Sequence, residues 1–292
     1  MRIVDPHVHI WDLSTGLYPG LEKPSTSFIG NNAAIARSYL LDELLAEGGG
    51  EVEIAKIVNV EAFPTRPLEE TRNLQALADK TGYPQGIVAL VDLSKSDAQA
   101  VLEEQVAFRN VRGIRQVLNM HQDPLYNYVG QNFMEDPLWR TNFGLLARYG
   151  LSFDLQLYPH QMKVAAALIA AHPDTQFILN HAGMYADRTL EGWREWKDGI
   201  RLFAKFPNAA VKISGLGMLD KNWTVESFRP YVFETIDAFD VQRTMFASNF
   251  PVDKLFSTYA AVWRAFAHIT GSFSESEREA LFISNAERIY RI

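Results

Sequence analysis

The chain has 292 residues, of which 47% are apolar, and this is enough to bury a substantial core. Its 28 basic and 35 acidic residues give a net charge of -7 without any basic run, so nucleic acid is not an expected partner. The absence of cysteine excludes disulfides, thiolate metal ligands and a cysteine nucleophile.

The first residues, MRIVDPHVHIW, lack the basic start, the apolar run and the cleavage site of a signal peptide. No stretch approaches the roughly 20 apolar residues that are needed to cross a bilayer. We therefore expect a cytoplasmic protein that acts on a small molecule and has neither membrane nor nucleic acid as a partner.

Short apolar runs rich in β-branched residues recur along the chain, separated by longer segments with helical periodicity. They predict eight strands, at residues 3–9, 54–60, 86–91, 112–117, 151–157, 176–181, 209–215 and 244–250. Between them, residues 97–108 place their apolar side chains on one helical face, and residues 67–80 open with a helix-initiating proline. Each predicted strand is followed by a helix.

The regular alternation of strand and helix, without a Pro-, Ser- or Gly-rich linker, predicts one α/β domain over residues 1–292. Eight units favour a (β/α)₈ TIM barrel. The alternative is an open doubly wound sheet, which normally carries a G-x-G-x-x-G turn after its first strand; residues 7–16 contain none. Near the end, Ser274 and Glu277 have capping-box spacing and predict an extra C-terminal helix.

Two long irregular connections, residues 11–35 and 118–134, follow the first and fourth predicted strands. In a barrel both would overhang the C-terminal ends of the strands. TIM-barrel enzymes carry their reacting groups at this end, so the polar residues that close each strand are the candidates for chemistry.

His7 and His9 form the most specific signal in the chain. Side chains two residues apart in a strand point to the same face, and two imidazoles aimed at one place suit a metal ion or a bound anion. A single strand histidine more often bonds to the backbone, but a pair at the end of a first barrel strand favours a site. Asp5 is placed to orient the pair. His181, which closes the sixth strand before a glycine turn, is the natural third nitrogen.

Arg115 ends an otherwise apolar strand, where an unpaired guanidinium would be strongly unfavourable. It should meet an anion, which is either an internal carboxylate, Glu61 or Asp154, or a substrate carboxylate or carbonyl. Lys212 poses the same choice, and a structural pairing is favoured there. Glu61 could be a ligand, a base or the partner of Arg115.

Aromatic residues gather on or beside the two long connections. Core packing explains most aromatics, and the alternative is stacking against a sugar-like or aromatic ligand. With Arg115, the candidates for substrate binding are Trp11, Tyr126 and Tyr128.

Several motifs occur together along the chain: DPHVHIWDL, YPGL, GIRQ, LNHAGM, VKISGL, MFASNFPVD and NAERIYRI. In this order they resemble the amidohydrolase-2 branch of the amidohydrolase superfamily, which includes sugar lactonases, dicarboxylate lactonases and, more distantly, metal-dependent aromatic decarboxylases. The resemblance implies a TIM barrel in which His7, His9 and His181 face the substrate or bind one divalent metal ion, Zn or Mn.

At the end of the eighth strand the sequence departs from that branch. A Ser-Asp-Trp-Pro motif there usually supplies an Asp that ligates the metal or activates water, whereas this chain has Asn249 in Ser-Asn-Phe-Pro. An amide can hold a water but cannot accept a proton near neutral pH. The base is then Asp253, Glu61 or a histidine, with helix capping as an equal alternative for Asp253. Losing an anionic ligand also weakens a zinc site, so a metal-independent enzyme is the alternative to a metal-dependent one.

The sequence therefore predicts a hydrolase that opens a small lactone or cyclic ester of a sugar acid or a carboxylated ring compound. The three histidines would polarise the carbonyl, and Arg115 would anchor a carboxylate or support the oxyanion. Asp253 or Glu61 would take the proton of a water that Asn249 positions. A nonoxidative decarboxylase and a ligand-binding barrel without catalysis are the alternatives. Barrels of this kind often pair, which leaves a homodimer open.

Overall fold

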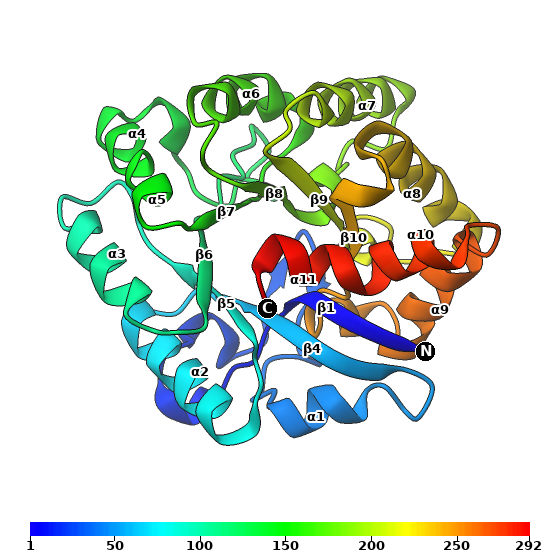
Figure 1. Ribbon diagram of the computed structural model, residues 1–292, viewed down its shortest axis with the longest axis horizontal. Helices are drawn as coiled ribbons and strands as arrows, with labels where there is room; N and C mark the ends of the chain where they lie inside the picture. Colours follow the sequence, from blue (N-terminus) through cyan, green and yellow to red (C-terminus); the bar gives the residue numbers. More distant parts are fainter.

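Eight parallel strands neighbour one another in chain order and curl into a (β/α)₈ TIM barrel (Figure 1). The structure, a computed structural model, describes residues 1–292. The strands are β1 (Arg2–Val8), β4 (Glu53–Val60), β5 (Gly86–Leu90), β6 (Val111–Arg115), β7 (Ser152–Leu155), β8 (Phe177–Leu179), β9 (Ala209–Ile213) and β10 (Thr244–Phe246). All eight predicted strands are confirmed, and the doubly wound alternative is wrong.

Helices cover the outside of the barrel and follow every strand. They are α1 (Leu41–Ala46), α2 (Pro67–Thr81), α3 (Ala98–Val106), α4 (Pro137–Phe143), α5 (Leu145–Arg148), α6 (Met162–Ala171), α7 (Leu190–Ala204), α8 (Val225–Phe239) and α9 (Tyr259–Ile269). A continuous cluster of 60 buried residues fills the space between strands and helices. None of these helices is long and apolar enough to cross a membrane.

The barrel closes where the last strand meets the first. Phe250, just beyond β10, forms a parallel bridge with Val8, and the backbone N–H of His9 donates to the carbonyl of Phe250 at 2.8 Å. The N–H of Asn249 likewise donates to the carbonyl of His7 at 2.9 Å. Closure therefore places the first and last predicted site segments side by side.

The C-terminal segment seals the opposite end of the barrel, as Figure 1 shows in red. It comprises α10 (Glu275–Glu279), a π turn (Ala280–Ser284) and α11 (Asn285–Tyr290). The predicted capping box is present, with Ser274 and Glu277 bonded reciprocally. Tyr290 is fully buried and packs with strand residues such as Val58 and Ile178 in a cluster of 10 buried residues. The predicted extra helix thus closes the bottom of the barrel.

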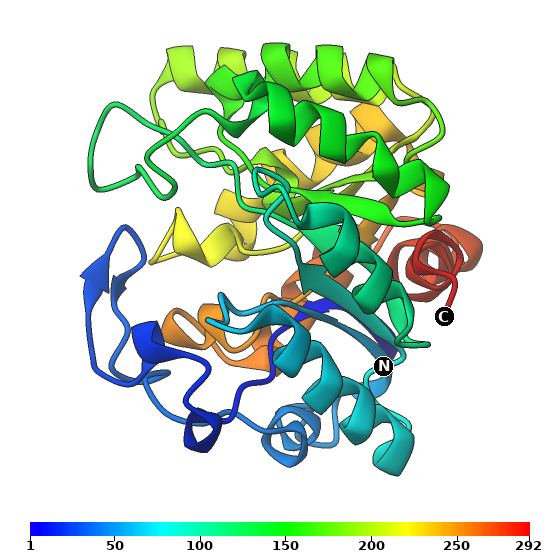
Figure 2. The ribbon, with the colours of Figure 1, turned by 90° about the vertical axis from the view of Figure 1, so that its left-hand side faces the viewer.

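The two long connections lie at the other end. Figure 2 shows both projecting on the side opposite to α11 and the chain termini. The first carries a short hairpin, β2 (Thr26–Ser27) with β3 (Gly30–Asn31). This arrangement agrees with the prediction that both connections overhang the C-terminal ends of the strands.

Candidate active site

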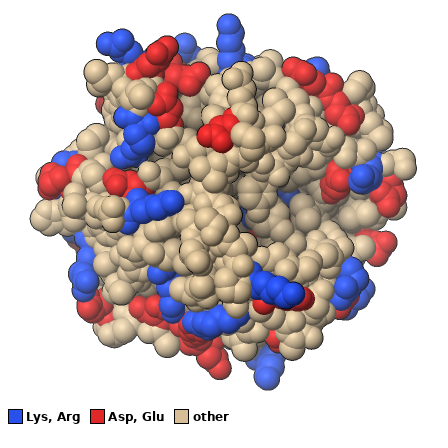
Figure 3. Space-filling model, turned by 180° about the vertical axis from the view of Figure 1, so that it is seen from behind, with Lys and Arg blue, Asp and Glu red and all other residues tan.

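A cavity of about 260 Å³ opens at the C-terminal ends of the strands. Its floor contains His9, His181, Arg115 and Asn249, from four different strand ends. Residues of the first long connection, including Trp11, form much of its wall. Figure 3 views the molecule from the face opposite to that of Figure 1 and shows a hollow bordered mostly by residues without charge.

The three predicted histidines lie together. The ring centroid of His7 is 5.1 Å from that of His9 and 4.6 Å from that of His181. His9 and His181 line the cavity, whereas His7 lies beneath them and is fully buried. Burial is the main cause that lowers the pKa of all three imidazoles, to about 3 for His9. They are therefore neutral near pH 7.

Local backbone geometry brings His181 to this position. The chain leaves β8 through His181 at φ 55°, a left-handed conformation that is uncommon for residues other than glycine. Gly215, beyond β9, makes room for the ring, because a Cβ there would lie 2.6 Å from Nδ1 of His181. The Nδ1 atom is 3.0 Å from the hydroxyl oxygen of Ser214. Strand β8 is shorter than predicted because its last residues turn in this way to present the imidazole.

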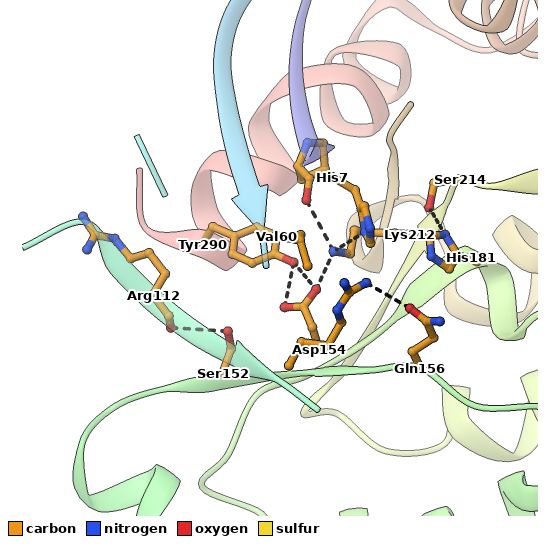
Figure 4. Close-up of polar contacts among 12 residues, drawn as sticks. His7, Val60, Arg112, Ser152, Asp154, Gln156, His181, Lys212, Ser214 and Tyr290 are labelled. Carbon is orange, nitrogen blue, oxygen red and sulfur yellow. Dashed lines mark hydrogen bonds and ion pairs between the residues drawn. The ribbon is translucent and has the colours of Figure 1, made fainter. Parts of the chain in front are cut away.

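Lys212 lies under the histidines, inside the barrel (Figure 4). Its ammonium group donates to Nδ1 of His7 at 3.0 Å, to the carbonyl of Pro6 at 3.3 Å and to Oδ1 of Asp154. The Tyr290 hydroxyl donates to the same carboxylate at 2.8 Å. Burial lowers the pKa of Lys212 to about 8, which still leaves it protonated at neutral pH. The favoured structural pairing of Lys212 is therefore present, with Asp154 as the partner.

These contacts fix the tautomers of two histidines. Since an ammonium group can only donate, Nδ1 of neutral His7 is an acceptor and its proton is on Nε2. That Nε2 atom is buried without a hydrogen-bond partner. His9 is the opposite case, because its Nδ1 lies 2.8 Å from the carbonyl oxygen of Val60 and must donate to it. His9 therefore keeps a lone pair on Nε2.

Arg115 and Glu61 form a second buried ion pair. The Nε of Arg115 donates to Oε1 of Glu61 at 2.6 Å, and Nη2 donates to the Glu61 carbonyl at 2.7 Å. A third N–H donates to Gln156 at 3.0 Å, so two of the five guanidinium N–H groups remain available. Of the alternatives left open for Arg115, the pair with Glu61 is the one the structure contains.

Asn249 reaches the cavity from the turn after β10, with φ 61°. Its amide nitrogen donates to Oδ2 of Asp253 at 2.6 Å, which leaves the amide oxygen as its free acceptor. Asp253 is buried behind it, and its other oxygen accepts the N–H of Gly217 at 3.2 Å. Burial raises the pKa of Asp253 to about 7.

This geometry disfavours both carboxylates that the sequence analysis offered as the base. Asp253 and Glu61 do not line the cavity. Both oxygens of Glu61 accept from the protein, Oε1 from Arg115 and Oε2 from the N–H of Phe63 at 2.7 Å. Neither carboxylate can therefore take a proton directly from a water held in the cavity.

The expected role of Asp5 is wrong. Its carboxylate accepts backbone N–H groups of His7 and Ser248 and the hydroxyl of Tyr259, and it touches no imidazole. The pairing of β1 with β4 is irregular between Asp5 and Val8, so the strict alternation of faces that placed Asp5 beside the histidines does not hold. Asp5 instead fixes the backbone at the point of barrel closure.

The predicted substrate-binding aromatics are only partly brought together. Trp11 and Tyr128 line the cavity, but Tyr126 does not. The carbonyl of Tyr126 accepts the hydroxyl of Tyr158 at 2.9 Å, and its ring lies 6.0 Å from that of Phe28. Tyr126 thus supports the wall from behind.

Comparison with known proteins identifies the family. A family model described as Amidohydrolase matches residues 4–292. The chain belongs to the amidohydrolase family. It is therefore an enzyme, a hydrolase on a TIM barrel, as the resemblance implied.

Individual relatives agree with this. The uncharacterized protein y4mH of Sinorhizobium fredii is 48% identical over 300 residues, which cover 100% of this chain and 99% of that protein. An L-fucono-1,5-lactonase of Burkholderia ambifaria is 27% identical over 308 residues, covering 99% of this chain and 95% of the other. A solved amidohydrolase of Burkholderia multivorans with bound Zn has a TM-score of 0.83 and 25% identity, and the match covers 100% of both chains.

A divalent metal is the cofactor that an amidohydrolase fold implies, but the residues present do not fit one. No group of three or more His, Cys, Asp and Glu side chains is arranged to hold a metal ion. His7 is tied at Nδ1 to a lysine cation and carries its proton on Nε2, the position that a metal would need. The family's usual aspartate is the neutral Asn249. An added divalent charge beside Lys212 would therefore find no free carboxylate to balance it.

The sequence did not predict that Phe63 lines the cavity or that Lys212 bonds to His7. Phe63, which follows Glu61 by two residues, lines the cavity, and no periodicity marks it. The bond from Lys212 to His7 spans 205 residues of sequence, so no local spacing signals it. The VKISG motif indicated that Lys212 needs a buried partner, but it did not identify that partner.

Proposed function

We propose that this amidohydrolase opens a small lactone or related cyclic ester with water and without a metal ion. One observation carries the proposal: neutral imidazoles, a guanidinium with unused N–H groups and an amide oxygen converge on one cavity. This set can hold a water, accept its proton and stabilise an oxyanion, which is the requirement for acyl transfer to water. The lactonase relative from Burkholderia ambifaria supports the same class of reaction.

His9 is the proposed base. Its Nε2 lone pair is free because Nδ1 donates to Val60, and the ring lines the cavity. Asn249 would hold the attacking water through its amide oxygen, with Asp253 keeping the amide in that orientation. The low pKa of His9 makes it a weak base alone, so its protonation would accompany formation of the oxyanion nearby.

Arg115 is the proposed direct donor to the oxyanion, and His7, which lies beneath the cavity, is proposed to act on it through a water. Two guanidinium N–H groups of Arg115 lack protein partners, and the buried Nε2–H of His7 has none either. Buried donors without partners are rare and call for an acceptor, here the carbonyl oxygen of the ester for Arg115 and a water for His7. The pairing with Glu61 favours this role for Arg115 over anchoring a carboxylate.

The reaction would then balance as follows. Water attacks the carbonyl carbon and gives one proton to His9 as the oxyanion forms. When the tetrahedral intermediate collapses, the ring C–O bond breaks, and the leaving oxygen takes the proton from His9. The product is the open hydroxy acid, which releases a proton to the solvent.

A pH-indicator assay over a panel of lactones tests the proposal directly. We expect acid release with the wild type and a loss of at least about 100-fold in kcat for His9→Gln. His268→Gln, on the exposed face of α9, is the matched control and should retain full activity. Tight lactone binding without turnover would instead favour a ligand-binding barrel, and full activity in His9→Gln would refute this mechanism.

A further inference from the structure

The cavity offers no unbalanced positive charge to a ligand. Arg115 is the only lysine or arginine among its lining residues, and it is neutralised by Glu61. The second buried cation, Lys212, is held by Asp154 below the histidines. Burial keeps the imidazoles neutral, as their lowered pKa values indicate. A carboxylate entering this cavity would lose its water without gaining a free cation.

Apolar side chains make up the larger part of the cavity wall. Of the 20 residues that line the cavity, 11 are hydrophobic. Among the polar ones in the first long connection, Asn32 already accepts the N–H of Ser25 at 2.6 Å through its side chain. This apolar part of the wall can pack against an apolar substituent of a ligand.

Phe63 and Tyr128 form an aromatic pair where the cavity meets solvent. Their ring centroids are 5.0 Å apart, and they are 44% and 50% exposed. Phe63 adopts a left-handed φ of 56°, and Glu61 holds that conformation by accepting its N–H. A strained residue of this kind persists only where its surroundings impose it, and such residues concentrate at ligand sites. The strain here exposes a large apolar ring to the cavity.

From these observations we infer that the natural ester is uncharged and carries an apolar or aromatic substituent that packs against Phe63 and Tyr128. The ester carbonyl lies at the histidine end of the cavity, and the substituent lies at its mouth. This inference rests on the proposed function for the ester group, but the preference for an apolar, uncharged ligand follows from the walls alone.

Binding of unreactive δ-lactams tests the ligand preference separately from the proposed ester hydrolysis. The probes are an unsubstituted δ-lactam and δ-lactams of the same ring size that bear a phenyl group, hydroxyl groups or a carboxylate. By calorimetry we expect the phenyl lactam to bind at least about tenfold more tightly than the others. Equal or tighter binding of the hydroxylated or carboxylated lactam, or no binding of any, would overturn the inference. Because no turnover is required, inactivity on all lactones would overturn only the proposed function.

Phe63→Ala identifies the residue responsible. We expect it to weaken binding of the phenyl lactam about tenfold and to change binding of the unsubstituted lactam less than about twofold. Phe233→Ala is the matched control, since Phe233 is a similarly exposed phenylalanine, 37%, on α8 and outside the cavity. A uniform loss for both lactams in Phe63→Ala, or an equal loss in Phe233→Ala, would contradict the assignment. Melting curves of both variants confirm that the fold is retained.

Discussion

The two buried ion pairs of the barrel use the same chemistry for different purposes. Lys212 and Asp154 lie below the histidines with no exposure, and all three ammonium protons have acceptors. Arg115 lies at the cavity floor with Glu61 buried behind it, and the guanidinium keeps two N–H groups for a ligand. One pair is completed within the protein and sets a tautomer, whereas the other is left incomplete on the side where substrate binds.

The geometry of the two cationic groups explains why an arginine lies at the cavity and a lysine lies in the barrel interior. A guanidinium presents five donors in a plane, so it can bind Glu61 and Gln156 and still face the cavity. An ammonium group is a compact donor of three bonds, which suits the narrow barrel interior between His7 and Asp154. We call Lys212 with Asp154 the inner pair and Arg115 with Glu61 the outer pair. Damage to the inner pair should affect folding and histidine chemistry, and damage to the outer pair should affect the preference for ligand charge.

Lys212→Met should produce the largest effect. It leaves Asp154 as an unpaired buried charge, at a cost of about 3–5 kcal/mol in the free energy of unfolding. It also frees His7 to adopt the other tautomer, so kcat should fall by at least about 100-fold. Urea unfolding and turnover at saturating substrate measure the two effects.

The double variant Lys212→Met/Asp154→Asn separates the loss of stability from the loss of kcat. With no charge left behind, it should regain most of the lost stability but none of the lost kcat. Nitrogen chemical shifts of His7 would report the changed tautomer. Recovery of both stability and kcat would show that the inner pair is structural only.

Glu70→Gln should change how stability depends on pH. Glu70 lies on α2 beside the outer pair; Tyr18 donates to it, and burial and then the charge of Glu61 raise its pKa from 4.5 to about 8. Between these values the folded protein keeps a proton that the unfolded chain has lost, so the free energy of unfolding falls as pH rises. The slope is up to about 1.4 kcal/mol per pH unit and flattens above about pH 8.

In Glu70→Gln this slope should be smaller by that amount between about pH 5 and about pH 8, as measured by urea unfolding. Asp5 and Asp253, whose pKa values burial raises to about 6 and about 7, contribute in the same direction in both proteins. Glu69→Gln, which removes a surface partner of Arg66, is the control and should not flatten the slope. Identical slopes in Glu70→Gln and wild type would show that Glu70 is ionised in the folded protein.

Glu61→Gln should alter ligand preference with a smaller effect. It leaves the charge of Arg115 uncompensated at the cavity, so the ratio of kcat/KM for a carboxylated over a neutral lactone should rise about tenfold. Asp154→Asn is the matched change in the inner pair and should leave this ratio unchanged, because Lys212 does not line the cavity. A similar rise in both variants would contradict the division between the two pairs.

Much of the fold could be predicted because local signals carry it. Apolar runs and helical periodicity gave all eight strands and the capped C-terminal helix, and barrel topology then brought His7, His9 and His181 together. Strand alternation failed at Asp5, where β1 is irregular. The last strand was predicted too long because its final residues turn at Asn249.

The electrostatics of the site could not be read from the sequence. Which carboxylate meets Arg115, and whether Asp253 faces the cavity or lies behind Asn249, depends on side-chain directions at turns with left-handed backbone. The tautomer of His7 depends on Lys212, on the opposite side of the barrel closure. Phe63 lines the cavity because of its left-handed backbone and its bond to Glu61, and neither feature is visible in the sequence.

Chelation should have the smallest effect. If both ion pairs are balanced within the protein, as their bonds indicate, no divalent ion is needed to complete the site, and dialysis against a chelator should change kcat/KM less than about twofold. Elemental analysis before and after dialysis provides the control for metal content. Loss of activity that added Zn restores would show that the histidines rearrange around a metal and that the bond from Lys212 to His7 breaks when it binds.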